Sequence, residues 1–351
     1  MKLSLVMISK NSETTLGLSL DSARDFVDEI IVVDTGSSDH SISIAKDHGA
    51  MVYTYVWKND FSDARNFALS KSSGDYNLIL DSDEQVVNID REKVTHYLKG
   101  INVIGKIKRI NFYDEDGEKR IFKEYISRVI PAGLIFSGRV HEQVYSTLPR
   151  VRLPIEVNHF GYYKTDKTDR NINLIKTELT CHPDNGYLHY HITQEYTQRK
   201  DFQLALQHFE IADTLLGGNE PFYSNFIVDW LYALIECSRW TIALQIIQRE
   251  RERLHDCSDF WFVYGMLCMS YAQINIEYFL EIKRAFLTCL SIGETLKYAT
   301  VDGTGSYLAM YNLGVFHEAL GEFNKAADWY RLSASLGYDR AEDRLKHMEQ
   351  N

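Results

Sequence analysis

The sequence has little of what builds disulfide-bonded, zinc-binding or membrane-spanning proteins. Its 351 residues include only five cysteines, none in a CxxC spacing, so we expect reduced thiols and neither a disulfide framework nor a zinc site. No apolar run is long enough to span a bilayer, and the run over 3–8 is too short for the core of a signal peptide. These absences predict a cytoplasmic protein without a transmembrane segment.

Positive charge and phosphate-binding loops are also scarce. The 38 Lys and Arg residues are outnumbered by 49 Asp and Glu residues, and the net charge of -11 argues against a nucleic-acid partner or a basic membrane-binding surface. No Gly-x-Gly-x-x-Gly follows the first apolar run, and no Walker loop occurs in the chain. A phosphate bound by this chain would therefore have to be met by a bound cation.

The first half of the chain alternates apolar strands with helical segments. Strands are predicted over 3–8, 29–34, 50–56 and 78–80, and helices over 14–26, 41–48 and 62–70. This alternation predicts a parallel, doubly wound sheet, in which ligands bind beyond the carboxyl ends of the strands. Because Ser9, Asp34 and Asp81 lie at the carboxyl ends of three of these strands, we predict a pocket at that edge of the sheet.

The strand over 78–80 runs directly into three carboxylates, Asp81, Asp83 and Glu84. Because strand side chains alternate, Asp81 and Asp83 would point to the same side if the strand geometry continued. Two carboxylates placed in this way suit Mg2+ or Mn2+, which usually keep some waters and complete their shell with substrate phosphates. The alternative is a strand that ends in an acidic, solvated turn.

Two further strands, over 104–112 and 121–130, flank Asp116-Gly117, which is a hairpin signal. Arg128 and Arg139 are cations close to the predicted pocket in this part of the chain, although most arginines of this kind are surface residues. The segment 136–144 contains a glycine turn followed by His141 and Glu142. The segment 155–162 then presents another histidine, His159, on a strand-like run.

Four blocks of this half resemble those of a family 2 glycosyltransferase of the GT-A fold. They are Ile8-Ser9-Lys10-Asn11, the segment 28–39, the segment 60–66 and Leu80-Asp81-Ser82-Asp83-Glu84. The resemblance implies a sugar-nucleotide donor, most often UDP-linked, and inversion at the anomeric carbon. It also implies a Rossmann-like α/β nucleotide-sugar domain, which we assign to residues 1–165.

The resemblance also implies roles for individual residues. Those expected to bind the nucleotide sugar are Ser9, Asn11, Glu13, Asp34, Arg65 and Asp81. Asp83 is expected to bind Mn2+ or Mg2+ together with a late histidine, for which His159 is the choice and His141 the rival. An inverting transfer needs a carboxylate that takes a proton from the acceptor, and Glu142 occupies the place of this base.

Each of these roles has a plainer alternative. Arg65 could pair with Asp60 or Asp63 on the protein surface, where an ion pair contributes well under about 1 kcal/mol. Glu142 could be an exposed residue beside a His141 that packs in the core.

From residue 166 onward the pattern is almost wholly helical, after a charged linker over 164–169. Two segments share the same spacing of large and small residues, namely Tyr196, Phe202, Ala205, Phe209 and Ala212 in one and His317, Phe323, Ala326, Tyr330 and Ser333 in the other. Such spacing lets paired helices approach closely and resembles the tetratricopeptide repeat. We predict an all-α domain over residues 166–351 with about four helix pairs, and an ordinary helical bundle is the alternative.

The two-part layout resembles that of enzymes that glycosylate bacteriocin peptides. We therefore expect a hexose to be moved from a UDP-sugar to a peptide or protein acceptor presented by the helical repeats, which could also join two copies as a homodimer. Two other functions fit the sequence. One is transfer to a surface glycan such as a lipooligosaccharide or exopolysaccharide, and the other is a non-catalytic repeat adaptor. The intact Asp81, Asp83, Glu142 and His159 argue against the adaptor.

Overall fold

The computed structural model describes residues 1–115, 118–160 and 168–349. The chain divides into two compact units, Met1–Pro183 and Asp184–Asn351, each of which is described by itself. The predicted hairpin turn at Asp116-Gly117 and most of the predicted linker over 164–169 lie outside the described residues.

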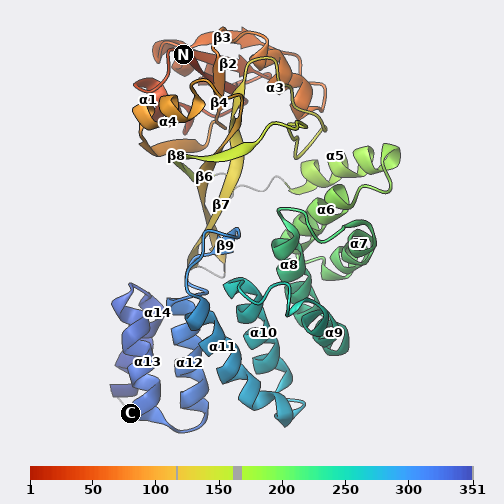
Figure 1. Cartoon of the computed structure of the whole chain (residues 1–351), viewed down its shortest axis with the longest axis vertical. Helices are drawn as coiled ribbons and strands as arrows, with labels where there is room; N and C mark the ends of the chain where they lie inside the picture. The colour runs from red at the N-terminus through yellow and green to blue at the C-terminus, as the bar shows by residue number, and fades with distance from the viewer. Residues whose placement is uncertain (116–117, 161–167, 350–351) are drawn as a thin grey trace. The chain divides into compact units, whose positions relative to one another are not determined.

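The first unit is built from strands and helices that alternate at first and then give way to a run of strands (Figure 1). In chain order its elements are β1 (Leu3–Ser9), α1 (Leu16–Arg24), β2 (Glu29–Asp34), α2 (Ser41–Asp47), β3 (Met51–Thr54), α3 (Phe61–Leu69), β4 (Tyr76–Ile79), β5 (Glu84–Ile89), α4 (Arg91–Leu98), β6 (Ile104–Glu115), β7 (Glu118–Pro131), β8 (Arg150–His159) and α5 (Thr168–Cys181). The elements predicted in this part of the sequence therefore form, with ends that differ by a few residues.

The sheet of this unit is mixed, not fully parallel. Its strand order is β3-β2-β1-β4-β7-β6-β8-β5. The first four strands of this order are parallel, as predicted, but β7 pairs with β4 in antiparallel orientation and β5 pairs with β8 in the same way. The prediction of a parallel sheet fails beyond β4 because β6 and β7 are joined as a hairpin, whereas a parallel pair needs a longer crossover connection.

Alternating side chains of the central strands fill a core on each face of the sheet. Leu3, Leu5 and Met7 of β1 pack on one face, with apolar residues of α1, α2 and α4. Val6 points to the other face and packs with Ala68 of α3. Both faces of the central strands are therefore buried, which explains why these strands are apolar at nearly every position.

The strand ends come together as the sequence predicts, except at the acidic run. Ser9 at the end of β1 is the register partner of Asp34 at the end of β2. Strand β4 stops at Ile79, and the backbone N–H of Glu84 donates to the Asp81 carbonyl at 3.0 Å, which makes the acidic run a turn. The strand alternation expected for Asp81 and Asp83 is therefore wrong, and their side chains meet different partners.

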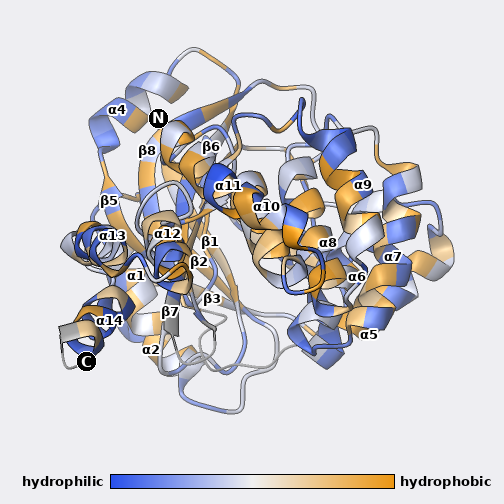
Figure 2. Cartoon of the chain, turned by 90° about the horizontal axis from the view of Figure 1, so that it is seen from below, coloured by the Kyte–Doolittle hydropathy of each residue, from blue (hydrophilic) through white to orange (hydrophobic). Residues whose placement is uncertain are grey.

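The second unit is helical apart from one short strand, β9 (Thr300–Val301). Its helices are α6 (Gly186–Gln198), α7 (Phe202–Leu215), α8 (Tyr223–Glu236), α9 (Trp240–Glu250), α10 (Ser258–Tyr271), η1 (Ile276–Tyr278), α11 (Phe279–Ile292), α12 (Tyr307–Ala319), α13 (Phe323–Ser335) and α14 (Asp339–Glu349). Figure 2 shows hydrophobic and hydrophilic residues side by side along these helices, as expected for helices that bury one face. The fold class, a GT-A-like α/β part followed by an all-α part, is confirmed.

The residues that suggested a repeat occupy the helix contacts. Ala205 and Ala326 are fully buried at equivalent places in α7 and α13, and so are the large Phe209 and Tyr330. A side chain at Gly314 would collide with the ring of Tyr330, so this glycine allows α12 and α13 to pack closely. Over the described residues of the unit, the helices follow one another as four pairs, α6/α7 to α12/α13, before α14.

Helix α5 groups with the first unit by its contacts, although the sequence placed it at the start of the helical part. The boundary after residue 165 stays a prediction. Within the first unit, Arg139 reaches α5 and lies 3.3 Å from the carboxylate of Glu178. Arg139 is 45% exposed and is thus the surface residue that the sequence suggested.

Candidate active site

The ends of β1 and β2 carry polar atoms that are buried without a partner. Asp34 is buried, and its Oδ2 accepts the backbone N–H groups of Gly36 and Ser37, both at 3.0 Å. Its other oxygen, Oδ1, is buried and makes no hydrogen bond with a described residue, and the same holds for Oγ of Ser9. Because buried polar atoms are nearly always hydrogen-bonded, these two indicate a ligand site.

Asn11 and Glu13 connect the loop after β1 to the loop after β2. Asn11 has a left-handed backbone (φ 48°), and its Oδ1 accepts the N–H of Ser38 at 2.8 Å. Glu13 accepts the backbone N–H of His40 at 3.1 Å and lies 3.0 Å from Nδ1 of that ring. These contacts lower the pKa of the Glu13 carboxylate. Both side chains therefore help to fix the two loops next to Ser9 and Asp34.

Arg65 is buried and is shared by two carboxylates, which rules out the alternative of a surface arginine. It lies on α3, whose N-cap Asp60 accepts the N–H of Asp63 at 2.9 Å. Arg65 Nε donates to Oε1 of Glu142 at 2.7 Å, and its Nη2 donates to Oδ1 of Asp81 at 3.1 Å. Its Nη1 is buried and makes no hydrogen bond with a described residue. One cation therefore joins the predicted base to the predicted nucleotide-binding carboxylate.

Asp81 lies between two arginines. Its Oδ1 accepts from Arg65, and its Oδ2 accepts from Nη2 of Arg128 at 2.8 Å. Burial alone would raise the pKa of Asp81, but the charges of Arg128 and Arg65 hold this pKa well below its ordinary value. Asp81 is therefore a permanent anion whose two oxygens are both engaged by protein cations, and it is poorly suited to be a direct metal ligand.

The ion pairs continue from Asp81 into the sheet. Glu84 is fully buried, with Arg128 Nη2 at 3.9 Å and Arg109 Nη1 at 3.3 Å from its Oε1. Arg109 also donates to Oε1 of Glu124 at 2.7 Å. Anions and cations thus alternate from Glu142 to Glu124. Such an alternation compensates charges that would be costly to bury alone.

Asp83 and His159 face each other across the turn, with 3.6 Å between Oδ1 of Asp83 and Nε2 of His159. The pairing of β5 with β8 brings them together, because Glu84 and His159 are register partners. Burial and then the charge of Arg109 lower the pKa of His159, which keeps the imidazole neutral at neutral pH. The contact with Asp83 favours His159 over His141 as the histidine of a metal site.

Asn111 on β6 fixes the tautomer of His159. Nδ2 of Asn111 donates to Oε1 of Glu124 at 3.0 Å and to the carbonyl of Phe122 at 3.3 Å. Its Oδ1 therefore faces Nδ1 of His159, 2.8 Å away, and an amide oxygen can only accept. The proton is thus on Nδ1, and the lone pair of Nε2 is directed at the Asp83 carboxylate. Two acceptors that face each other fit a cation held between them.

In the part of the chain that the structure describes, no three His, Cys, Asp or Glu side chains converge on one metal position. Asp83 and His159 would therefore hold a metal as two protein ligands. The chemistry of a carboxylate and a neutral imidazole suits Mn2+ or Mg2+ when phosphate oxygens and waters complete the shell.

Glu142 sits on a loop that is tied to α3. Ser137 and Gln143 exchange two backbone hydrogen bonds at 2.9 and 3.0 Å, which close the loop. Asn66, next to Arg65 on α3, donates from Nδ2 to the carbonyl of Phe136 at 2.9 Å and accepts the Phe136 N–H at 2.8 Å. The same helix therefore positions the loop of Glu142 and the arginine that contacts Glu142.

The side chain of Glu142 is 11% exposed, so it is not the freely exposed carboxylate of the alternative. Its neighbour His141 has a left-handed backbone (φ 50°), and burial lowers the pKa of its ring to about 4. His141 is thus a neutral, half-buried residue with a buried Nε2, so it is only partly packed in the core as that alternative supposed.

Two residues of this site were not identified from the sequence, Asn66 and Asn111, whereas Arg128 was named as a cation close to the pocket with a surface position as the alternative. Asn66 lies inside the block 60–66, so its position beside Arg65 was the one available signal. Asn111 acts through a strand pairing that brings distant segments together. Arg128 is only 13% exposed and contacts Asp81, so the surface alternative does not hold for it.

The sequence of the α/β part matches a known family. Residues 4–148 match the family described as Glycosyl transferase family 2. A TPR repeat-containing protein of Synechococcus elongatus is 43% identical over 206 residues, covering 53% of this chain and 50% of that protein. The SPbeta prophage-derived glycosyltransferase SunS of Bacillus subtilis is 27% identical over 191 residues, covering 51% of this chain and 45% of SunS. These matches cover about half the length of the curated relatives.

Among solved structures, the glucosyl-3-phosphoglycerate synthase of Mycobacterium tuberculosis, crystallised with Mn2+ and uridine-diphosphate-glucose, is 26% identical. That match covers 32% of this chain and 44% of the synthase, with a TM-score of 0.26. No helix within the described residues is long and apolar enough to cross a membrane. The match over 4–148 and the four sequence blocks within it lead to one assignment: the chain carries a glycosyl transferase family 2 domain.

Proposed function

We propose that this chain is an inverting, metal-dependent glycosyltransferase that moves a hexose from a UDP-sugar to a peptide or protein acceptor. The observation that carries the proposal is the position of Arg65, which contacts both Glu142 and Asp81. Arg65 therefore holds the proposed base for the acceptor close to a carboxylate of the proposed donor site. A single displacement at the anomeric carbon requires this proximity.

The unpartnered buried atoms support a nucleotide donor. Oδ1 of Asp34 is an acceptor that fits the imide N–H of uracil, and Oγ of Ser9 can donate or accept beside it. Nη1 of Arg65 is a donor that fits an oxygen of the ribose or the diphosphate. Each of these atoms would gain the partner that the described residues do not give it.

Asp83 and His159 would hold the divalent metal that a diphosphate leaving group needs. When bound, the ion would offset the negative charge that develops on the departing nucleotide. The contact with Asn111 places the His159 proton on Nδ1, so the lone pair of Nε2 is available to bind the ion.

Glu142 is the proposed base. Its Oε1 is held by Arg65, while its Oε2 makes no hydrogen bond with a described residue and can accept a proton from the acceptor. In this arrangement Arg65 orients the carboxylate without occupying both of its oxygens.

A peptide or protein acceptor is supported by the helical unit and by the similarity to SunS, at 27% identity. Stacked helix pairs offer extended surfaces for peptides, whereas a small sugar acceptor needs no second domain. A homodimer joined by the helical unit is part of the same proposal.

The donor can be tested with the purified full-length chain and a panel of UDP-hexoses. We expect hydrolysis or transfer in the presence of Mn2+ and its loss with a chelator, together with a rise in melting temperature when UDP-sugar and Mn2+ are both present. Absence of both effects with every donor would contradict the proposal and favour a non-catalytic adaptor.

Glu142→Gln tests the base, because the amide oxygen can still accept from Arg65 but the side chain cannot take a proton. We expect kcat to fall by about a hundredfold to ten-thousandfold while the donor affinity stays unchanged. The matched control is Glu92→Gln on the exposed first turn of α4. A variant that keeps its kcat would remove Glu142 from the mechanism.

The acceptor class can be separated by incubating the enzyme and a radiolabelled UDP-sugar with peptides in one series and with lipooligosaccharide or exopolysaccharide fragments in another. We expect label in the peptide series. Label confined to the glycan series would overturn the peptide assignment while leaving the transferase in place.

A further inference from the structure

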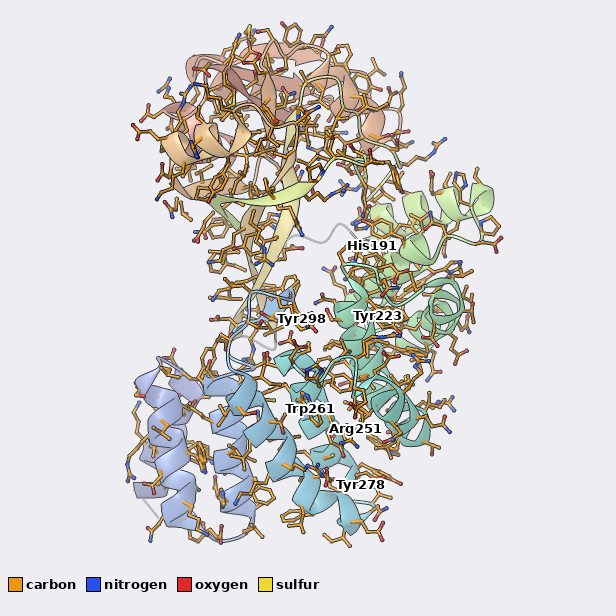
Figure 3. The ribbon with its side chains drawn as sticks, viewed as in Figure 1. His191, Tyr223, Arg251, Trp261, Tyr278 and Tyr298 are labelled. Carbon is orange, nitrogen blue, oxygen red and sulfur yellow. The ribbon has the colours of Figure 1, made fainter. Side chains whose placement is uncertain are left out.

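A cavity of about 260 Å3 lies in the helical unit between the end of α9, the start of α10 and the segment from η1 to α11. Its walls are apolar and aromatic, with Ile247 from α9 and Trp261 and Tyr264 from α10. The volume is slightly below the range of small-molecule sites, so the cavity is sized for a side chain and not for a whole cofactor. Figure 3 labels Trp261, Arg251 and Tyr278 in this part of the unit.

The cavity has a cation without a partner among the described residues. Arg251, at the C-terminal end of α9, lines it, and its guanidinium makes no ion pair or hydrogen bond with a described residue. The neighbouring arginines differ, since Arg249 lies 2.7 Å from Asp213 and Arg253 lies 3.2 Å from Glu250. The hydroxyl of Tyr278, a lining residue from η1, likewise has no partner among the described residues.

Glu281, the acidic residue among the described residues that line the cavity, already has partners on both carboxylate oxygens. Oε2 of Glu281 accepts from the Tyr264 hydroxyl at 3.2 Å, and its Oε1 lies 3.5 Å from Nη1 of Arg284. Glu281 is thus paired on both oxygens, and the charge of Arg251 is left to be matched by a ligand. A half-buried guanidinium beside a hydroxyl is a good receptor for a carboxylate, which it can bind with two parallel hydrogen bonds.

The segment that supplies Tyr278 and Glu281 also carries exposed apolar residues. Ile274 is 70% exposed, Ile276 is 74% exposed and Leu280 is 75% exposed. Large apolar side chains that are close in sequence and this exposed indicate an interaction surface. A ligand that uses both features combines an anionic group for the cavity with apolar groups for this segment.

We propose that this cavity binds the Glu or Asp side chain of a peptide whose neighbouring residues are apolar, with Arg251 and Tyr278 holding the carboxylate between the rings of Trp261 and Tyr264. Leu and Ile side chains of the peptide would lie on Ile276 and Leu280. The inference rests on the proposed function in one respect: such a peptide would be part of the acceptor.

The test uses the full-length chain and two synthetic probes, acetyl-Leu-Leu-Glu-Leu-Leu-amide and the same peptide with Gln in place of Glu. Binding is followed by the indole N–H signal of Trp261, one of five tryptophans, assigned with Trp261→Phe. We expect the Glu peptide to bind about tenfold more tightly than the Gln peptide, the effect of one charge-assisted pair. Arg251→Gln should abolish this preference, and Tyr278→Phe should reduce it.

Arg331→Gln is the matched control, because Arg331 is an exposed helical arginine that lies 2.8 Å from Asp328. It should keep the full preference. Equal affinity for the two peptides, no response of Trp261 to either, or an unchanged preference in Arg251→Gln would each overturn the proposal. The measurement needs neither sugar nucleotide nor metal. A negative result would therefore not contradict the proposed transferase activity, and an inactive transferase would not contradict the proposed binding cavity.

Discussion

Replacing Asn66 by alanine weakens the attachment of the Glu142 loop to helix α3 without touching a residue proposed to contact substrate. The change removes two hydrogen bonds to the Phe136 backbone, at 2.9 and 2.8 Å. A typical intramolecular hydrogen bond contributes about 1 kcal/mol, so local opening of the loop should become easier by about 2 kcal/mol. That difference corresponds to roughly thirtyfold faster exchange when reclosing is fast, because each 1.4 kcal/mol is a factor of about ten.

Hydrogen exchange followed by mass spectrometry or NMR measures this effect directly. The amides of Phe136 and Gln143 should exchange roughly thirtyfold faster in Asn66→Ala, while those of the central strands stay unchanged. In the transfer assay kcat should fall by about tenfold to a hundredfold, since a displaced base costs that much, with the KM for the donor unchanged.

Asn173→Ala is the control, because Asn173 is an exposed residue of α5 in the same unit. It should change neither exchange nor kcat. Unchanged exchange at Phe136 in Asn66→Ala would refute the reasoning whatever the activity, and a fall in kcat without faster exchange would point to a different role for Asn66.

Three further predictions concern other parts of the molecule. Arg65→Met leaves Asp81 and Glu142 without their shared cation, so the free energy of unfolding in urea should fall by about 3 kcal/mol. An unchanged midpoint of the urea transition would count against a buried ion pair. Asn111→Ala removes the hydrogen-bond partner of Nδ1 of His159 and should raise the Mn2+ concentration for half-maximal turnover at least about tenfold. Equal Mn2+ titrations of the variant and the native chain would show that the tautomer of His159 does not affect metal binding. Burial raises the pKa of Asp259 to about 7, so the folded chain keeps a proton there that the unfolded chain loses at its ordinary, lower pKa. Stability contributed by this proton is present at low pH and is lost as the pH rises toward about 7. The melting temperatures at about pH 5 and about pH 8 should therefore differ less in Asp259→Asn than in the native chain. An equal difference would exclude Asp259 as the source of the pH dependence.

The parts of the fold that depend on local pattern could be predicted from the sequence. Apolar runs end at Ser9 and Asp34, and the structure pairs these two residues in register at one edge of the sheet. The helical unit followed from small residues such as Ala205 and Ala326, which are fully buried where helices meet. In both cases the residues that carry the signal lie close to one another in the chain.

The parts that depend on pairing between distant strands could not be predicted. Asn111 and His159 are register partners of β6 and β8, and the sequence holds no local mark of that register. The turn at Asp81 is another example, because the side chain of Glu84 accepts the Asp81 N–H at 3.0 Å and ends the strand alternation. The roles of Asp83, His159 and Glu142 in catalysis stay predictions.

The neutral ring of His141 bears on how turnover should respond to acidity. With a pKa of about 4, this imidazole carries no charge at any pH near neutrality. It therefore cannot switch the field around Glu142 between pH values of about 6 and about 8, although an ordinary histidine would do so. A limb of the rate profile in that range would therefore have to originate in a group other than His141.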